Sequence, residues 1–114
     1  MEKDLEQRTK RFSLGVIKFV SSLPRTREAD VLGRQLLRSA TSIGANYREA
    51  NRGVSRADFA NKIGIVQKEA AETQYWLELL LESALAAGDN ATTLHAECSE
   101  LLAIFTSIGK KLKE

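Results

Sequence analysis

The sequence contains little of what supports disulfide bonding or membrane insertion. Its 114 residues include a single cysteine, and Cys98 falls on the apolar stripe of a predicted helix, so we interpret it as a small buried hydrophobe rather than a reactive thiol. No apolar run approaches the ~18–20 residues that span a bilayer. The N-terminal stretch MEKDLEQRTKRF lacks the apolar core of a signal peptide. We therefore expect a cytoplasmic protein.

Patterns that support catalysis or metal binding are also scarce. His95 is the only histidine, which excludes the paired Glu-x-x-His motifs of a ferritin-like di-iron site. The sequence has no Gly-rich phosphate loop, no cysteine pair and no Ser/His/Asp set on loops. Glu69 and Glu72 could hold a divalent cation, which leaves a metal-dependent enzyme open as an alternative. The sequence offers neither a histidine nor a further clustered carboxylate to complete such a site. We expect no catalytic residue, no metal and no cofactor.

Apolar residues, in contrast, recur at alternating spacings of three and four in four separate stretches. This spacing gathers them on one side of an α-helix. The stripes are Leu5, Thr9, Phe12, Val16, Phe19 and Leu23; Ala29, Leu32, Leu36, Ala40, Ile43, Tyr47 and Ala50; Phe59, Ile63, Val66, Ala70, Thr73, Leu77, Leu80 and Ala84; and Leu94, Cys98, Leu101, Phe105, Ile108 and Leu112. Four such helices bury their stripes against one another, so the pattern predicts an all-α four-helix bundle, one domain over residues 1–114.

Turn and capping residues set the expected helix ends. Pro24 ends a first helix over about residues 3–22. Thr26 is a plausible N-cap for a second helix that reaches about residue 52, where Gly53 follows. Ser55 opens a third helix in the manner of a capping box.

The third helix is expected to continue to about residue 87, before a turn at 88–90 and a fourth helix over about 91–113. At ~32 residues it would be ~48 Å long, far above the average helix. Trp76, Leu79 and Leu81 lie off its main stripe and widen its apolar arc. A long helix with a broad apolar arc predicts self-association.

Charge is unevenly distributed, although the net charge is only +2. Residues 8–56 contain eleven basic and three acidic residues, a balance of +8, whereas residues 61–114 contain five basic and eight acidic residues, a balance of −3. A basic half beside an acidic half indicates either a polyanionic partner or mutual neutralisation, within the bundle or between subunits.

The second helix has three distinct faces. Arg27, Arg34, Arg48 and Arg52 fall opposite the apolar stripe, with Arg38 at the edge of that row. Arginines along one helix face suit nucleic-acid phosphates, although a solvated face with an Asp30–Arg34 pair gives the same pattern. No aromatic residue lies on this face, which argues against reading of single-stranded bases.

A row of small and polar residues, Gln35, Ser39, Ser42, Asn46 and Glu49, borders the core on the third face. Arg38 and Arg48 are placed to reach Glu69 and Glu72 on the next helix. We interpret this row first as a structural network that fixes helix register.

The segment QLLRSATSIGANYREA, residues 35–50, resembles the central motif of the four-helix-bundle family of the 23S rRNA intervening-sequence protein. The resemblance extends over about residues 12–85 through SRADF at 55–59, KIGI at 62–65 and ETQYWLEL at 72–79. Two departures are Tyr47 in place of the usual isoleucine and Ala50 in place of the frequent glycine. The motif residues are Arg38, Ser39, Ser42, Asn46, Glu49, Glu69 and Glu72.

The resemblance implies an antiparallel, up-down-up-down, left-handed four-helix bundle that assembles into a ring, commonly a homopentamer. Some relatives resemble the accessory protein of diversity-generating retroelements, which engages a reverse transcriptase and nucleic acid. We therefore expect a non-enzymatic homo-oligomer that binds RNA or DNA backbone. The candidate contacts are Arg27, Arg34, Arg48, Arg52 and Arg56. The alternative is a protein-interaction scaffold, or an accessory subunit of an enzyme such as a reverse transcriptase, that binds no nucleic acid itself.

Overall fold

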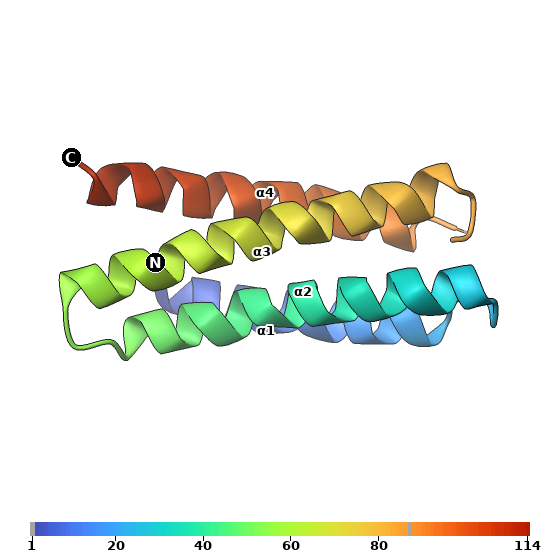
Figure 1. Cartoon of the computed structure of the whole chain (residues 1–114), viewed down its shortest axis with the longest axis horizontal. Coiled ribbons are helices and arrows are strands. Elements are labelled where there is room, and N and C mark those ends of the chain that lie inside the picture. Colours follow the sequence, from blue (N-terminus) through green and yellow to red (C-terminus); the bar gives the residue numbers. More distant parts are fainter. Residues whose placement is uncertain (1, 87) are drawn as a thin grey trace.

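The computed structural model describes residues 2–86 and 88–114, and these residues form four helices and no β-strand. The helices are α1 (Glu2–Ser21), α2 (Arg27–Asn51), α3 (Arg56–Glu82) and α4 (Asn90–Leu112). The connecting loops lie at alternate ends, so that consecutive helices run in opposite directions and both chain ends lie at the same end (Figure 1). The all-α fold expected from the apolar spacing is confirmed.

Each helix packs against two of the other three. Helices α1 and α3 both contact α2 and α4, which makes α1 and α3 one diagonal of the bundle and α2 and α4 the other. The bundle measures 44 × 22 × 21 Å. The left-handed twist that the resemblance implies stays a prediction.

The core consists of the apolar stripes that the spacing predicts. Leu36, Ile43, Ile63, Leu77 and Leu101 are among the fully buried side chains, and Cys98 is buried with them. Tyr47 is also fully buried and packs against Phe105 across the α2–α4 diagonal, with ring centroids 5.1 Å apart and an interplanar angle of 63°. Edge-to-face contact of this kind is worth about 0.5–1.5 kcal/mol beyond the area that it buries. No helix within residues 2–86 and 88–114 is both long and apolar enough to cross a bilayer.

Two helices begin where hydroxyl side chains cap them. The Oγ1 of Thr26 accepts a hydrogen bond from the Ala29 amide at 3.1 Å, and the Oγ of Ser55 accepts one from the Asp58 amide at 3.1 Å. Each cap satisfies an amide that has no partner inside the helix. Both starting points match the expectation from the sequence.

The end of α3 does not match. The sequence predicted a helix to about residue 87, which lies outside the described residues, but α3 ends at Glu82. Ala84 adopts a φ of 61°, and its amide donates to the Leu81 carbonyl at 3.3 Å. A left-handed residue ends a helix, so Ala84 is exposed rather than part of the core stripe. At 27 residues, α3 is close in length to α2 with 25, and its length gives little support for self-association.

Candidate nucleic-acid interface

The outward face of α2 presents four of the five candidate arginines to solvent. The exposed fraction of their side chains is 87% for Arg27, 77% for Arg34, 54% for Arg48 and 64% for Arg52. The face lies opposite the buried stripe because the two sets are half a helical turn apart. From residue 27 to residue 52 the row extends ~38 Å along the helix axis.

Three carboxylates lie near this row, but most of the contacts are long. Arg34 lies 3.1 Å from Asp30 and Arg27 lies 3.6 Å from Glu28. Ion pairs between exposed side chains contribute little to stability and are screened by salt. These guanidinium groups are therefore available to exchange a carboxylate for a phosphate.

Glu6 of α1 is shared by the other two arginines. It lies 3.8 Å from Arg48 and 3.7 Å from Arg52, and it accepts a 2.8 Å hydrogen bond from Asn51. One carboxylate facing two guanidinium groups leaves an excess of positive charge at this end of α2. The periodicity of α2 alone did not reveal Glu6, because it belongs to a different helix.

Arg56 lies apart from the row. It is the first residue of α3, and its guanidinium donates to the carbonyl of Leu112 at the end of α4, at 3.3 Å. The carbonyl end of a helix attracts a cation. The structure therefore groups Arg27, Arg34, Arg48 and Arg52 on one face and assigns Arg56 to the junction of α3 and α4.

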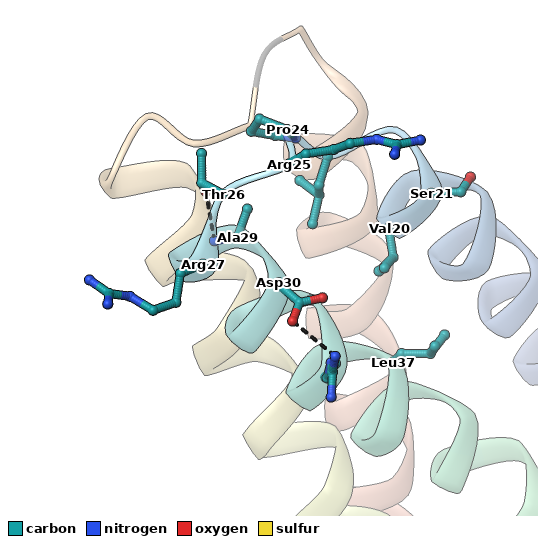
Figure 2. Close-up of a pocket in the computed structure, with 12 residues that line it drawn as sticks. Val20, Ser21, Pro24, Arg25, Thr26, Arg27, Ala29, Asp30 and Leu37 are labelled. Carbon is teal, nitrogen blue, oxygen red and sulfur yellow. Dashed lines mark hydrogen bonds and ion pairs between the residues drawn. The ribbon is translucent and has the colours of Figure 1, made fainter.

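A hollow of about 570 Å³ lies at the α1–α2 corner. Figure 2 shows aliphatic side chains such as Val20 and Leu37 along it, while Arg25 and Arg27 extend away toward opposite sides. The guanidinium groups therefore occupy the rim of the hollow and do not converge on one point. Arg25 follows Pro24 in the loop, outside any helical pattern, which is why the sequence did not single it out.

A second hollow of about 400 Å³ lies farther along the groove between α1 and α2. Lys10 of α1 and Arg48 of α2 both line it, so the basic surface extends from α2 onto α1. Gly44 lies against Thr9 of α1, where a Cβ atom would come within 3.3 Å of the threonine hydroxyl. Because Gly44 is small, α1 and α2 approach closely, and Lys10 of α1 lies on the same surface as Arg48 of α2.

The polar motif of α2 forms contacts to α3. Arg38 lies 3.3 Å from Glu69 and donates to Glu72 at 3.1 Å. The hydrogen bond to Glu72 raises the pKa of the Arg38 guanidinium. Deeper in the bundle, the Thr73 hydroxyl donates to Ser39 Oγ at 2.8 Å, with both residues fully buried. These contacts join α2 to α3 in one register.

The remaining motif residues do not all join this network. Asn46 donates to the Ser42 carbonyl at 2.9 Å, one turn earlier in its own helix, and Ser42 donates to the Arg38 carbonyl at 2.9 Å. Glu49 accepts from Lys62 of α3 at 2.6 Å on the exposed surface. Arg48 was expected to reach Glu69 and Glu72, but it lies on the α1 side of α2, next to Glu6.

Cys98 and His95, the residues considered for catalysis, both contact side chains or backbone of α3. Cys98 is buried, which raises the pKa of its thiol to about 12, and it donates to the Ala70 carbonyl at 3.3 Å. A thiol with so high a pKa is a poor nucleophile near neutral pH. His95 Nε2 lies 3.0 Å from Glu78. In the part of the chain that the structure describes, no three histidine, cysteine, aspartate or glutamate side chains are grouped to hold a metal ion.

Comparison with known proteins identifies the family. The model of the 23S rRNA-intervening sequence protein family matches residues 2–107, nearly the whole chain. The chain belongs to this family. The resemblance noted in residues 12–85 is thereby confirmed and extended to α1 and most of α4.

A solved structure supports the same assignment. A crystal structure of a protein of unknown function from the S23 ribosomal protein family of Bacteroides thetaiotaomicron VPI-5482 is similar, with a TM-score of 0.84 and 37% sequence identity. The similarity covers 92% of this chain and 97% of that one. A search of curated proteins found no match. Family membership therefore establishes the fold, and the function must be argued from the surface.

Proposed function

We propose that this member of the 23S rRNA-intervening sequence protein family is a cytoplasmic, non-enzymatic homo-oligomer that binds the phosphate backbone of RNA or DNA through the outward face of α2. The observation that carries the proposal is the row of exposed guanidinium groups of Arg27, Arg34, Arg48 and Arg52. Four arginines face three carboxylates, Glu28, Asp30 and Glu6, in contacts of 3.1–3.8 Å.

The chemistry of the face favours phosphates over bases. Arginine offers a planar fork that matches two phosphate oxygens. Tyr47, the aromatic residue of α2, is fully buried against Phe105 and has no exposed ring for a base to stack on. Contacts to phosphates position a nucleic acid without reading its sequence, so we expect binding with little sequence preference.

Self-association would strengthen a weak contact by avidity. The ring of five copies implied by the family resemblance stays a prediction, and Arg56, at the junction of α3 and α4, remains a candidate contact outside the row. Several copies in one assembly would present several α2 faces to one long polyanion. Affinity for long nucleic acids would then exceed affinity for short ones.

A binding titration tests the proposal. The variant Arg34→Gln/Arg48→Gln/Arg52→Gln removes three positive charges from the face while keeping residues that favour helix. The control Lys110→Gln/Lys111→Gln/Lys113→Gln removes the same charge from the end of α4. We expect the arginine variant to lower affinity for generic duplex DNA at least about tenfold and to reduce the slope of log affinity against log salt by about two to three.

The control should change both quantities much less. Binding by the wild type that is absent, or that responds equally to the two variants, would contradict the proposal. Light scattering on each variant checks that the assembly is intact.

The second candidate is a scaffold or an accessory subunit, for example of a reverse transcriptase, that contacts protein only. It is favoured by the observation that all four arginines of the face lie within 4 Å of a carboxylate. A protein partner would then supply further carboxylates. In that case the arginine variant loses its oligomeric state or its protein partner, and the wild type binds no nucleic acid.

A further inference from the structure

The outward side of α1 carries two exposed apolar residues beside the groove between α1 and α2. Leu14 is 56% exposed and Ile17 is 47% exposed. They belong to the run Lys10, Leu14, Ile17 and Ser21, whose spacings of four, three and four place it on one side of the helix. Lys10 lines the smaller hollow of the groove and Ser21 lines the larger one. The apolar pair therefore lies between the two hollows.

The facing side of α2 is uncharged along the middle of the groove. Leu37 lines the larger hollow, while Thr41 and Gly44 line the smaller one, again at spacings of four and three. Figure 2 shows Leu37 of α2 and Val20 of α1 at the larger hollow, on the two walls of the groove. Apolar and small residues at this spacing on two neighbouring helices suit the apolar side of a third helix.

Cations lie at both ends of this uncharged strip. Arg25 and Arg34 line the larger hollow, and Lys10 and Arg48 line the smaller one. From Arg34 to Arg48 helix α2 rises about 21 Å. A segment that lies in the groove therefore meets positive charge at each end and apolar or small side chains between them.

The cations that α1 and the following loop contribute are unpaired. Four such side chains are exposed and form no ion pair with another described residue: Lys10, Arg11, Lys18 and Arg25. Each carboxylate that lines the two hollows, in contrast, already contacts a cation of α2 or α3; these are Glu6, Asp30 and Glu49. The groove therefore has an excess of positive charge, which carboxylates of a partner would complement.

The exposed apolar pair distinguishes this surface from the arginine row of α2. Phosphates gain nothing from Leu14 and Ile17, whereas burial of apolar side chains is a main source of affinity between proteins. An apolar strip flanked by unpaired cations matches the reverse pattern, which is an apolar stripe flanked by carboxylates. These observations favour a protein segment over a nucleic acid as the occupant of the groove.

We propose that the α1–α2 groove binds an acidic amphipathic helix of a partner protein. The apolar side chains of that helix cover Leu14 and Ile17 and enter the two hollows. Its carboxylates, at both ends, pair with Lys10 and Arg25. About four turns of helix cover the ~21 Å between the ends of the groove. The inference does not rest on nucleic-acid binding by α2.

Synthetic peptides test the proposal on the whole chain by fluorescence anisotropy. The probe is a helical peptide of about sixteen residues, with leucines at spacings of four and three and glutamates at both ends. A scrambled peptide of the same composition lacks the apolar side, and a third peptide carries lysines in place of the glutamates. We expect saturable binding of the acidic amphipathic peptide and at least about tenfold weaker binding of the other two.

A matched pair of variants locates the binding. Ile17→Lys removes half of the apolar pair and should weaken binding of the acidic amphipathic peptide about fivefold or more. The control is Val31→Lys, which replaces a β-branched residue of similar exposure, 53%, and adds the same charge. Val31 lies seven residues before Arg38, on the side of α2 that meets α3, so this control should bind the peptide as the wild type does.

Charge reversal tests the role of the unpaired cations. Lys10→Glu/Arg25→Glu should weaken binding of the acidic peptide about tenfold and strengthen binding of the lysine peptide. Both residues are exposed and unpaired among the described side chains, so the change breaks no contact within the bundle. Circular dichroism on each variant checks that the helices are intact.

Duplex DNA and light scattering separate this proposal from the alternatives. An acidic peptide that does not bind, binds no better than the scrambled one, or binds Ile17→Lys and Val31→Lys equally would overturn it. So would an Ile17→Lys variant that binds DNA more tightly with no effect on the peptide, because the groove would then belong to a nucleic-acid surface. A lower assembly mass for Ile17→Lys would show that a second copy covers the pair. Failure of the wild type to bind DNA would contradict only the function proposed for α2.

Discussion

The α2–α3 pair and the α1–α4 pair lie on different sides of the bundle and are joined by different chemistry. Between α2 and α3, a fully buried Thr73–Ser39 hydrogen bond of 2.8 Å lies beneath the partly exposed Arg38–Glu72 contact. Between α1 and α4, the polar contact comes from Arg8, which donates to Glu97 at 2.7 and 2.9 Å and also to Glu100. Beside the shared core, the described polar contacts between α2 and α3 involve several side chains, whereas those between α1 and α4 all involve Arg8.

The helix ends show the same difference. Both α2 and α3 begin with a hydroxyl side chain that accepts an amide hydrogen bond. Asp89, the N-cap of α4, forms no such side-chain bond. Helices α1 and α4 also make the least extensive of the four helix–helix contacts. The α2–α3 pair therefore has several redundant sources of stability, whereas α1 depends on Arg8 and on the core for its attachment to α4.

Replacing the arginine of each pair tests this difference and should give the largest effect. Arg8→Met keeps an apolar stem but leaves Glu97 and Glu100 close together without their cation, and hydrogen bonds to charged groups are worth about 1.5–3 kcal/mol. We expect a loss of about 2 kcal/mol in the free energy of unfolding. Arg38→Met should cost about 1 kcal/mol, because Arg38 is half exposed.

Urea unfolding followed by circular dichroism measures both values. Arg11→Met, on the exposed face of α1, serves as the control for changes in net charge and helix propensity. If Arg38→Met costs as much as Arg8→Met, the two helix pairs do not differ in the way described.

The sequence predicts the α2–α3 pair better than the α1–α4 pair for a physical reason. Spacing within a helix determines which residues share a face, so the arginine row of α2 was expected. Of the two arginines expected to reach Glu69 and Glu72, Arg38 does so and Arg48 does not. Spacing does not determine which residue of another helix lies opposite. The pairing of Arg8 with Glu97 and Glu100, between α1 and α4, therefore appeared only in the structure.

Two basic residues were missed for related reasons. Arg25 belongs to a loop and Lys10 to α1, so neither falls on the periodic row of α2 that identified the candidate face. Both become part of the surface because α1 and α2 pack closely, with Gly44 against Thr9. A search for cations on every helix neighbouring α2 would have included Lys10.

The buried Cys98 thiol of α4 makes the free energy of unfolding depend on pH. Burial and the nearby Glu97 charge raise the pKa of the Cys98 thiol from 9.0 to about 12. Because the folded value is the higher one, the stabilisation is complete below pH 9 and is lost as pH rises toward 12. Between pH 8 and pH 10 the unfolded thiol loses its proton while the folded thiol keeps it, which costs about 1.4 kcal/mol.

The matched variant is Cys98→Ala, which removes the thiol and leaves every lysine and tyrosine in place. Its unfolding free energy should fall by about 1.4 kcal/mol less than that of the wild type between pH 8 and pH 10. Parallel pH profiles for the two proteins would show that the thiol does not have the raised pKa. Alkylation of the wild type at pH 8 should likewise require unfolding, because Cys98 is buried.

The smallest expected effect concerns the end of α3, the one helix boundary that the sequence did not predict. Alanine is the strongest helix former, yet Ala84 adopts a φ of 61°, a left-handed conformation that a Cβ atom disfavours. Ala84→Gly relieves this strain and should raise the free energy of unfolding by about 0.5–1 kcal/mol. The control Ala96→Gly, exposed within α4, should lower it by about 1 kcal/mol. If the free energy of unfolding rises for Ala84→Gly and falls for Ala96→Gly, the left-handed backbone at Ala84 ends α3. If it falls for both variants, Ala84 has an ordinary helical conformation.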